Sequence, residues 1–242
     1  MAERLQKWLA TKGFGSRREI ERWIVDGRIK VDGKTAVLGA KVDGTEKIVV
    51  NGKAVRIEAR EARQRTLIYH KPPGEICSRA DPQKRRTIFK SLPKVLGQRW
   101  VSVGRLDYQT TGLILVTTDG ELANKLMHPS SELEREYVVR AFGELSQEQL
   151  AELRKGVQLE DGEAKFDSIE LSGGAGGGAN RSYVVTVREG RNRIVRRLFE
   201  SVGCRVNRLM RVRYGVVSLP RDLRPGKHRE LTESEVAQLL AG

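Results

Sequence analysis

A loop aspartate is the first feature of this sequence that could carry chemistry. Asp107 lies in the string S-V-G-R-L-D-Y-Q-T-T-G-L-I-L-V, between two apolar stretches that are predicted to be strands, and Arg105 flanks it. A loop aspartate usually forms a turn or a cap. In a closed pocket, desolvation would raise the pKa of such a carboxylate unless a cation offset the effect. The residue alone therefore fits either a structural or a chemical role.

A group of arginines could supply such a cation. A helix is predicted near residues 192–202, and spacing of i, i+3 and i+4 would place three arginines on one of its faces: Arg193, Arg196 and Arg197. Phosphate contact is the alternative role, and we prefer it for Arg193. The residues alone do not decide which arginine would face a carboxylate.

The overall charge indicates a polyanionic partner. The 242 residues include 45 Lys and Arg against 31 Asp and Glu, a formal net charge of +14, and 30 of the basic residues are arginine. Arginine is suited to bidentate phosphate contacts. The charge is also segregated: residues 1–65, 66–113 and 188–213 carry +7, +6 and +7, whereas residues 114–170 carry −7. This distribution predicts a protein with a nucleic-acid face and an acidic back.

Composition argues against several classes of protein. No apolar run has the length of a membrane span, and the N-terminus lacks the apolar core of a signal peptide, so we expect a cytoplasmic protein with no membrane partner. The two cysteines, Cys77 and Cys204, cannot build a disulfide scaffold. The three histidines lack metal-ligand spacing, so we expect no metal site.

Residues 1–58 are predicted to form a compact module. Apolar residues within 5–9 have helical spacing, and a second helix is predicted to begin at Ser16, which forms a capping-box pattern with Glu19. Two hairpins should follow, with turns at Asp32-Gly33 and Asn51-Gly52. The module is therefore two short helices with a small, hairpin-rich sheet.

A polar linker over residues 59–65 is predicted to lead into a second unit, residues 66–242. This unit alternates apolar strands with amphipathic helices, two of which have capping residues at Ser146 and Thr232. Long strands mixed with interspersed helices favour an α+β fold over a regular βαβ repeat.

The first sixty residues resemble the S4 RNA-binding module. The strings R-L-Q-K-W-L-A and S-R-R-E-I-E-R-W-I-V-D-G-R-I-K-V-D-G carry the resemblance. In that family the two helices and the following loop contact structured RNA. The resemblance therefore implies RNA contacts here from Lys7, Ser16, Arg17, Arg18, Arg22 and Lys30. For any one of these residues, a solvated helix face is the alternative.

The rest of the chain, over nearly all of residues 66–230, resembles the pseudouridine synthases. Four motifs carry this resemblance: K-P-P-G at 71–74, G-R-L-D with T-T-G-L around Asp107, E-R-E-Y-V-V at 134–139, and E-G-R-N-R-I-V-R-R-L-F-E at 189–200. With an S4 module in front, the chain is similar to the branch of the small-subunit synthase A and the large-subunit synthases B, E and F, and most similar to the B group. The family fold implies a mixed, mainly antiparallel sheet with flanking helices and a central RNA-binding cleft.

The resemblance assigns catalytic roles to three residues. Asp107 matches the indispensable carboxylate, Arg196 its basic partner, and Tyr137 an aromatic that stacks on the flipped uracil and helps to remove the C5 proton. Arg105 and Leu209 match the substrate pocket. Taken alone, Tyr137 and Leu209 would be assigned to a hydrophobic core. Further RNA contacts are expected from Arg191, Asn192, Arg193 and Arg197.

The activity implied by the resemblance is conversion of a uridine to pseudouridine in 23S ribosomal RNA, near the peptidyl-transferase centre. Because the two nucleosides are isomers, no cofactor and no metal are expected. A uridine in a duplex must first be flipped out, at roughly a few kcal/mol. The enzyme is expected to be a monomer. Two alternatives remain: a non-enzymatic S4-type RNA-binding or ribosome-assembly factor, and a synthase acting on another rRNA site or on tRNA.

Overall fold

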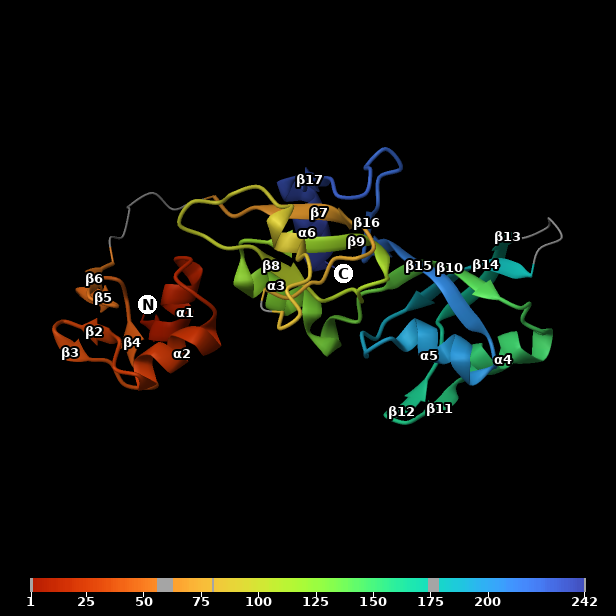
Figure 1. Cartoon of the computed structure of the whole chain (residues 1–242), viewed down its shortest axis with the longest axis horizontal. Helices are drawn as coiled ribbons and strands as arrows, with labels where there is room; N and C mark the ends of the chain where they lie inside the picture. Colours follow the sequence, from red (N-terminus) through yellow and green to blue (C-terminus); the bar gives the residue numbers. More distant parts are fainter. Residues whose placement is uncertain (1, 56–62, 80, 174–178, 242) are drawn as a thin grey trace. The chain divides into compact units, whose positions relative to one another are not determined.

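The chain divides into two compact units in the computed structural model (Figure 1). The first unit contains Met1–Gln64 with two short later segments, Pro93–Trp100 and Thr118–Gly120, and the second contains the remainder. The structure describes the whole chain except residues 1, 56–62, 80, 174–178 and 242. Most of the linker predicted over 59–65 therefore lies outside the described residues.

The first unit begins with the two predicted helices, α1 (Leu5–Thr11) and α2 (Arg17–Val25). The Ser16 hydroxyl accepts a hydrogen bond from the Glu19 backbone N–H at 3.1 Å, and the Glu19 carboxylate accepts one from the Ser16 N–H at 3.2 Å. This reciprocal pair is the predicted capping box, and it satisfies N–H groups that a helix start leaves without partners.

Short antiparallel strands complete the first unit. Asp32 and Asn51 have positive φ, 49° and 52°, and each precedes a glycine that also has positive φ, so both predicted hairpin turns are confirmed. Buried apolar side chains from both helices and the strands form one core cluster. The strands are β1 (Glu3–Arg4) paired with β4 (Lys41–Val42), and a sheet of β3 (Lys34–Thr35), β2 (Ile29–Val31), β5 (Ile48–Val50) and β6 (Lys53–Ala54) in that order.

The second unit is built on one mixed sheet of nine strands. Among the described residues of this sheet, the contact between β15 and β9 is the one parallel strand pairing and the others are antiparallel, so the sheet is mixed and mainly antiparallel, as predicted. The strand order is β13 (Ser168–Gly173), β14 (Asn180–Val187), β10 (Arg135–Phe142), β15 (Arg205–Tyr214), β9 (Thr111–Thr117), β7 (Thr66–Lys71) and β17 (His228–Glu230), with β16 (Val217–Ser218) on β15 and β8 (Val101–Val103) on β9.

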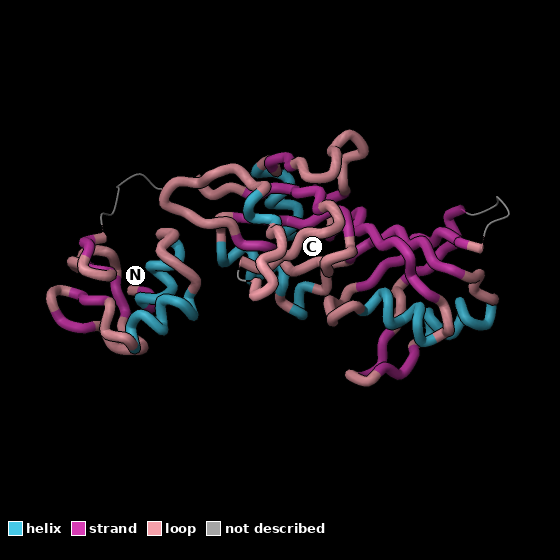
Figure 2. The backbone as a smooth tube through the Cα atoms, in the orientation of Figure 1, coloured by secondary structure: helices cyan, strands magenta, loops and turns pink. Residues whose placement is uncertain are grey.

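Helices cover the two halves of this sheet separately. α4 (Gln147–Lys155) and α5 (Ile194–Ser201) lie along the half formed by β10, β13, β14 and β15 (Figures 1 and 2). α3 (Gly120–Met127) and α6 (Glu233–Ala241) contribute leucines to the core cluster of the β7–β9 half. The predicted caps are present, because Ser146 and Thr232 accept hydrogen bonds from the N–H groups of Gln149 and Glu235. A separate hairpin consists of β11 (Val157–Leu159) and β12 (Gly162–Ala164).

The two halves of the sheet meet at a very close backbone contact. In the short parallel pairing, Met210 lies opposite Thr111 and Arg211 opposite Gly112. Gly112 has φ of 101°, and a Cβ atom there would lie 2.7 Å from the Arg211 nitrogen and would overlap its carbonyl oxygen. Glycine is therefore required at this position both by the space available and by the backbone conformation.

We expect Gly112→Ala to destabilise the second unit strongly. Positive φ alone costs an alanine about 1–2 kcal/mol, and the overlap with Arg211 adds to that cost. Gly226→Ala is the matched control, because Gly226 has φ of 80° but nothing within 4 Å of an added Cβ. Urea unfolding should show a clearly larger loss for Gly112→Ala, and equal losses would contradict the claim of crowding.

Candidate active site

Four of the five residues predicted for catalysis or the substrate pocket line one pocket of the second unit. The pocket has a volume of about 790 Å³. Its walls come from the loop before β9, from β10 and β15, and from the loop between β14 and α5. The residues that were predicted for catalysis or substrate binding and that line it are Arg105, Asp107, Tyr137 and Leu209.

A buried lysine fixes the loop that carries Asp107. Lys71, at the end of β7, is fully buried, and its Nζ donates hydrogen bonds to the carbonyl oxygens of Thr110 at 2.8 Å, Pro72 at 3.1 Å and Tyr108 at 3.3 Å. Burial lowers the pKa of Lys71, and nearby groups including Asp107 counteract this shift. The lysine of the K-P-P-G motif thus holds the segment that directly follows Asp107, at Tyr108 and Thr110.

Tyr137 and Leu209 come from neighbouring strands of the sheet. Both are buried, at 8% and 5% exposure, and both line the pocket. On β10 and β15, Tyr137 lies opposite Arg211 and Val139 opposite Leu209, with a bulge next to Tyr137. A bulge turns a side chain away from the regular alternation of the strand. The pocket wall therefore offers an aromatic ring and an aliphatic side chain close to the Asp107 loop.

Arg196 lies behind the pocket. It is 8% exposed on α5, and its Nη1 donates to the Val206 carbonyl at 2.9 Å. Burial lowers the pKa of Arg196, and the charge of Arg193 lowers it further, whereas the charge of Asp107 raises it. Asp107 and Arg196 are thus close enough for their charges to interact, and Arg196 is buried in the protein.

Arg193 does not share a helix face with Arg196 and Arg197. It has φ of 52° and occupies the position before α5, which begins at Ile194. The predicted spacing fails because the chain turns sharply here before the helix starts. Arg193 is exposed and lines the pocket together with Asn192, so both remain candidates for contact with RNA.

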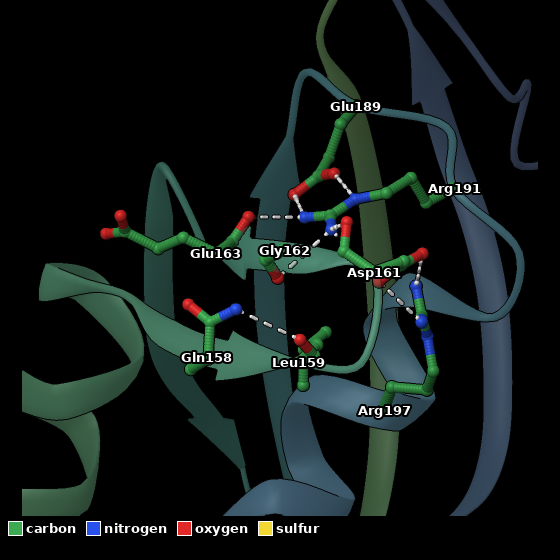
Figure 3. A network of polar contacts seen from close by, with 8 residues as sticks. All are labelled: Gln158, Leu159, Asp161, Gly162, Glu163, Glu189, Arg191 and Arg197. Carbon is green, nitrogen blue, oxygen red and sulfur yellow. Dashed lines mark hydrogen bonds and ion pairs between the residues drawn. The ribbon is translucent and has the colours of Figure 1, made fainter.

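Arg191 and Arg197 are engaged with the β11–β12 hairpin (Figure 3). Both oxygens of Asp161 accept from Arg197, at 2.8 and 3.0 Å. Arg191 pairs with Glu189 and Asp161 and donates to the carbonyls of Gly162 and Glu163. Every nitrogen of the Arg191 guanidinium is used, so in this structure the side chain holds the pocket loop to the hairpin. Arg191 also lines the pocket, and its contact with RNA stays a prediction.

The predicted RNA-binding residues of the first unit mostly face solvent. Arg17, Arg18, Arg22 and Lys30 are exposed. Lys7 forms an ion pair with Glu3 at 3.4 Å, and the Ser16 hydroxyl is occupied by the helix cap. Ser16 therefore acts on the start of α2, and the exposed basic residues form the surface that can meet a polyanion.

Sequence reasoning missed two residues of the pocket wall, Thr110 and Arg211. Both are buried and line the pocket. Arg211 follows Leu209 by two residues on a strand, so strand alternation was a signal that the two share a face. Thr110 lay inside the recognised Asp107 motif but has no chemistry that distinguishes it from a turn residue. Tyr214 also lines the pocket, with Arg135 and Arg211 each 5.1 Å from its ring centroid.

Comparison with known proteins places this site in a family. A family model described as RNA pseudouridylate synthase matches residues 65–201, and an S4 domain model matches residues 3–48. The chain belongs to the RNA pseudouridylate synthase family. The predicted family, fold class and S4 module are thereby confirmed, and the chain is an enzyme of the pseudouridine synthase type.

Individual pseudouridine synthases match nearly the whole chain. Ribosomal large subunit pseudouridine synthase B of Salmonella typhi is 55% identical over 234 residues, 96% of this chain and 80% of that protein. The protein of the same name from Pseudomonas aeruginosa is 53% identical over 237 residues, 98% of this chain and 61% of its own. A solved crystal structure of a pseudouridylate synthase superposes with a TM-score of 0.68 at 27% identity, covering 98% of this chain and 99% of that one. The predicted likeness to the B group is confirmed.

Metal binding and membrane crossing are two further properties on which the described residues bear. Within the part of the chain that the structure describes, no cluster of three or more His, Cys, Asp or Glu residues is arranged to hold a metal ion. Among the described helices, none has both the length and the apolar character needed to cross a membrane.

We expect Lys71→Met to loosen the loop that carries Asp107. Removing the ammonium takes a hydrogen-bond donor from three carbonyl oxygens, of which that of Tyr108 keeps the Gly74 N–H. The loss should cost about 3 kcal/mol of unfolding free energy and lower the catalytic rate. Lys90→Met, which removes an exposed lysine, is the control. Thermal unfolding and an assay of pseudouridine formation check both effects. A Lys71→Met protein as stable and active as the control would show that the loop is held by other contacts.

Proposed function

We propose that this enzyme isomerises one uridine of large-subunit ribosomal RNA, with Asp107 as the catalytic carboxylate. Asp107, Tyr137 and Leu209 line one pocket, and the charge of Asp107 acts on the buried Arg196; this arrangement carries the proposal. Its relatives are named ribosomal large subunit pseudouridine synthase B, which supports large-subunit ribosomal RNA as the substrate. The 23S stem-loop near the peptidyl-transferase centre is the proposed target.

In the proposed reaction, the N1–C1′ bond breaks and its electron pair leaves with the uracil. The Asp107 carboxylate either bonds to C1′ or takes a ribose proton, and both routes require it to be ionised. The base then turns and C5 bonds to C1′, while the carboxylate leaves C1′ or returns the ribose proton. C5 loses its proton and N1 gains one. Product and substrate have the same atoms, so the proposed reaction uses no cofactor and no metal.

The other site residues have complementary roles. Arg196 supplies a buried positive charge that interacts with the charge of Asp107. Tyr137 and Leu209 hold the flipped uracil between an aromatic ring and an aliphatic side chain. The Tyr137 hydroxyl assists removal of the C5 proton. Arg105, which is exposed at the pocket, binds the backbone of the target nucleotide.

RNA affinity is proposed to be divided between the two parts of the chain. Residues 1–58 would act as the S4 RNA-binding domain, residues 59–65 as a linker and residues 66–242 as the catalytic domain, in a protein that works as a cytoplasmic monomer. Recognition would rely on the shape of the RNA and on its unpaired bases, because side chains cannot read the deep groove of an RNA helix.

Asp107→Asn should abolish turnover and leave RNA affinity unchanged. The substitution keeps the size of the side chain but removes its charge, so we expect the rate to fall by at least about 10³-fold. Tritium release from [5-³H]uridine-labelled 23S transcript, in buffer with excess EDTA, measures the rate, and filter binding measures the affinity. Asp222→Asn, in an exposed loop, is the matched control. An Asp107→Asn protein that releases tritium at the wild-type rate would refute the proposal.

Two further variants in the same assay separate the supporting roles. Arg196→Met should be severely slowed, because it removes the buried positive charge that interacts with Asp107. Tyr137→Phe should retain binding and lose much of its rate. Mapping the modified position by carbodiimide primer extension on total rRNA tests the 23S target: a pseudouridine placed in another RNA would contradict the proposed substrate, and binding without any modification would favour an assembly factor.

The exposed arginines of the first unit should contribute affinity without affecting chemistry. Replacing Arg17, Arg18 and Arg22 together by Gln should weaken RNA binding about tenfold or more and reduce its salt dependence, since fewer counterions are released. The control replaces three exposed lysines of the same unit by Gln: Lys34, Lys41 and Lys53. Equal losses in the two triple variants would mean that only net charge matters. The single-turnover rate at saturating enzyme should be the same in both.

A further inference from the structure

Two side-chain polar groups of the pocket wall are buried and have no hydrogen-bond partner among the described residues. Thr110 is 2% exposed and Arg211 is 3% exposed. Among the described residues, none forms a hydrogen bond with the Thr110 hydroxyl or with Nη2 of Arg211. Most buried polar groups in proteins have a partner, and each exception calls for an explanation. Both residues line the pocket that contains Asp107, so bound substrate is the candidate partner.

The guanidinium of Arg211 is held in a fixed position. Its Nε donates to the Leu113 carbonyl at 2.8 Å, and the group lies 5.1 Å from the Tyr214 ring centroid. Arg211 shares a face of β15 with Leu209 and lies opposite Tyr137 on β10. With Nε occupied, the η nitrogens are the donors that remain for a ligand, and they lie among the residues proposed to hold the uracil.

The backbone of Thr110 is fixed as well. Its N–H donates to the Asp107 carbonyl at 3.1 Å, and its carbonyl accepts from Lys71 at 2.8 Å. Only the hydroxyl is left without a partner among the described residues. The hydroxyl thus lies in the same wall as Arg211, within the loop that positions Asp107.

The reaction creates a charge that such a site can bind. When the N1–C1′ bond breaks, the departing uracil keeps the electron pair, and the negative charge spreads from N1 to its two carbonyl oxygens, O2 and O4. Fixed donors directed at developing charge in a water-poor site are among the largest contributions to catalysis. This step rests on the proposed function.

The geometry points to a further catalytic contact: Arg211 and the Thr110 hydroxyl together bind a carbonyl oxygen of the target uracil and stabilise the uracil anion after the N1–C1′ bond breaks. A base oxygen fits this position better than a phosphate does. Arg211 is buried beside Leu209 and Tyr137, whereas Arg105 and Arg193 line the same pocket and are exposed where the RNA backbone would lie.

Thr110→Val gives the first test, because stability and activity should change in different directions. Valine has the shape of threonine but lacks the hydroxyl that is buried without a partner, so the melting temperature should stay the same or rise. The single-turnover rate on the target stem-loop should nevertheless fall about tenfold. An unchanged rate, or a rate and a melting temperature that fall together, would overturn the inference. Inactive wild-type protein would instead refute the proposed function.

Sulfur substitution in the RNA gives the second test. Stem-loops carrying 2-thiouridine or 4-thiouridine at the target offer a weak acceptor in place of O2 or O4. One of them should slow the wild-type enzyme, and the same RNA should cause no additional loss in Arg211→Met. Arg208→Met, on the opposite face of β15, is the control and should respond to the thio-RNA as wild type does.

Pseudouridine formation is measured by mass spectrometry of the digested RNA under single-turnover conditions. Equal thio effects in wild type and Arg211→Met, or no thio effect in wild type, would show that Arg211 does not contact the base. If Arg211→Met fails to fold, the same comparison with Thr110→Val decides the inference, because that variant leaves the Leu113 contact of Arg211 intact.

Discussion

The close parallel contact between β9 and β15 is the constraint on which the site depends. The Asp107 loop ends where this contact begins, so the loop must lie beside the part of β15 that carries Leu209 and Arg211. A side chain at Gly112 would separate the two strands. The pocket therefore exists because one residue without a Cβ lets the two halves of the sheet meet at backbone distance.

Buried cations are then arranged around Asp107 through backbone carbonyls. Lys71 binds three carbonyl oxygens, Arg196 binds that of Val206, and Arg211 binds that of Leu113. A carbonyl group fixes the position of a cation and leaves its charge in place, whereas a paired carboxylate would neutralise that charge. The positive charge is thus retained for Asp107, which lines the pocket, and for charge that develops on a substrate.

Local features could be predicted from the sequence, and non-local ones could not. The capping boxes at Ser16 and Thr232 and the turn at Asp32 involve residues at most three apart, so the patterns alone identified them. The role of Arg191 depends on a hairpin about thirty residues away in the chain, and that of Arg211 on contact with β9. Helical spacing misplaced Arg193 because Arg193 itself has positive φ and lies just before the first residue of the helix. Asp107, Tyr137 and Leu209 came from the family resemblance, since their residue types alone favoured a turn and a core.

The fold also changes the meaning of the charge pattern. The acidic segment, residues 114–170, and the basic segment, residues 188–213, look like opposite faces in the sequence, but β10, β14 and β15 bring them together. Glu134 pairs with Arg188 at 2.9 Å and with Arg213 at 3.1 Å, and Asp161 binds Arg197 at 2.8 Å. Much of the positive charge in 188–213 is therefore neutralised within the protein. Exposed basic residues remain at the pocket, where Arg105 is exposed and Arg193 pairs with Glu200 at 3.7 Å, and in the first unit. Because phosphates bind where positive charge is both exposed and unneutralised, we expect RNA to bind at residues such as Arg105, which say more about its position than the total of +14 does.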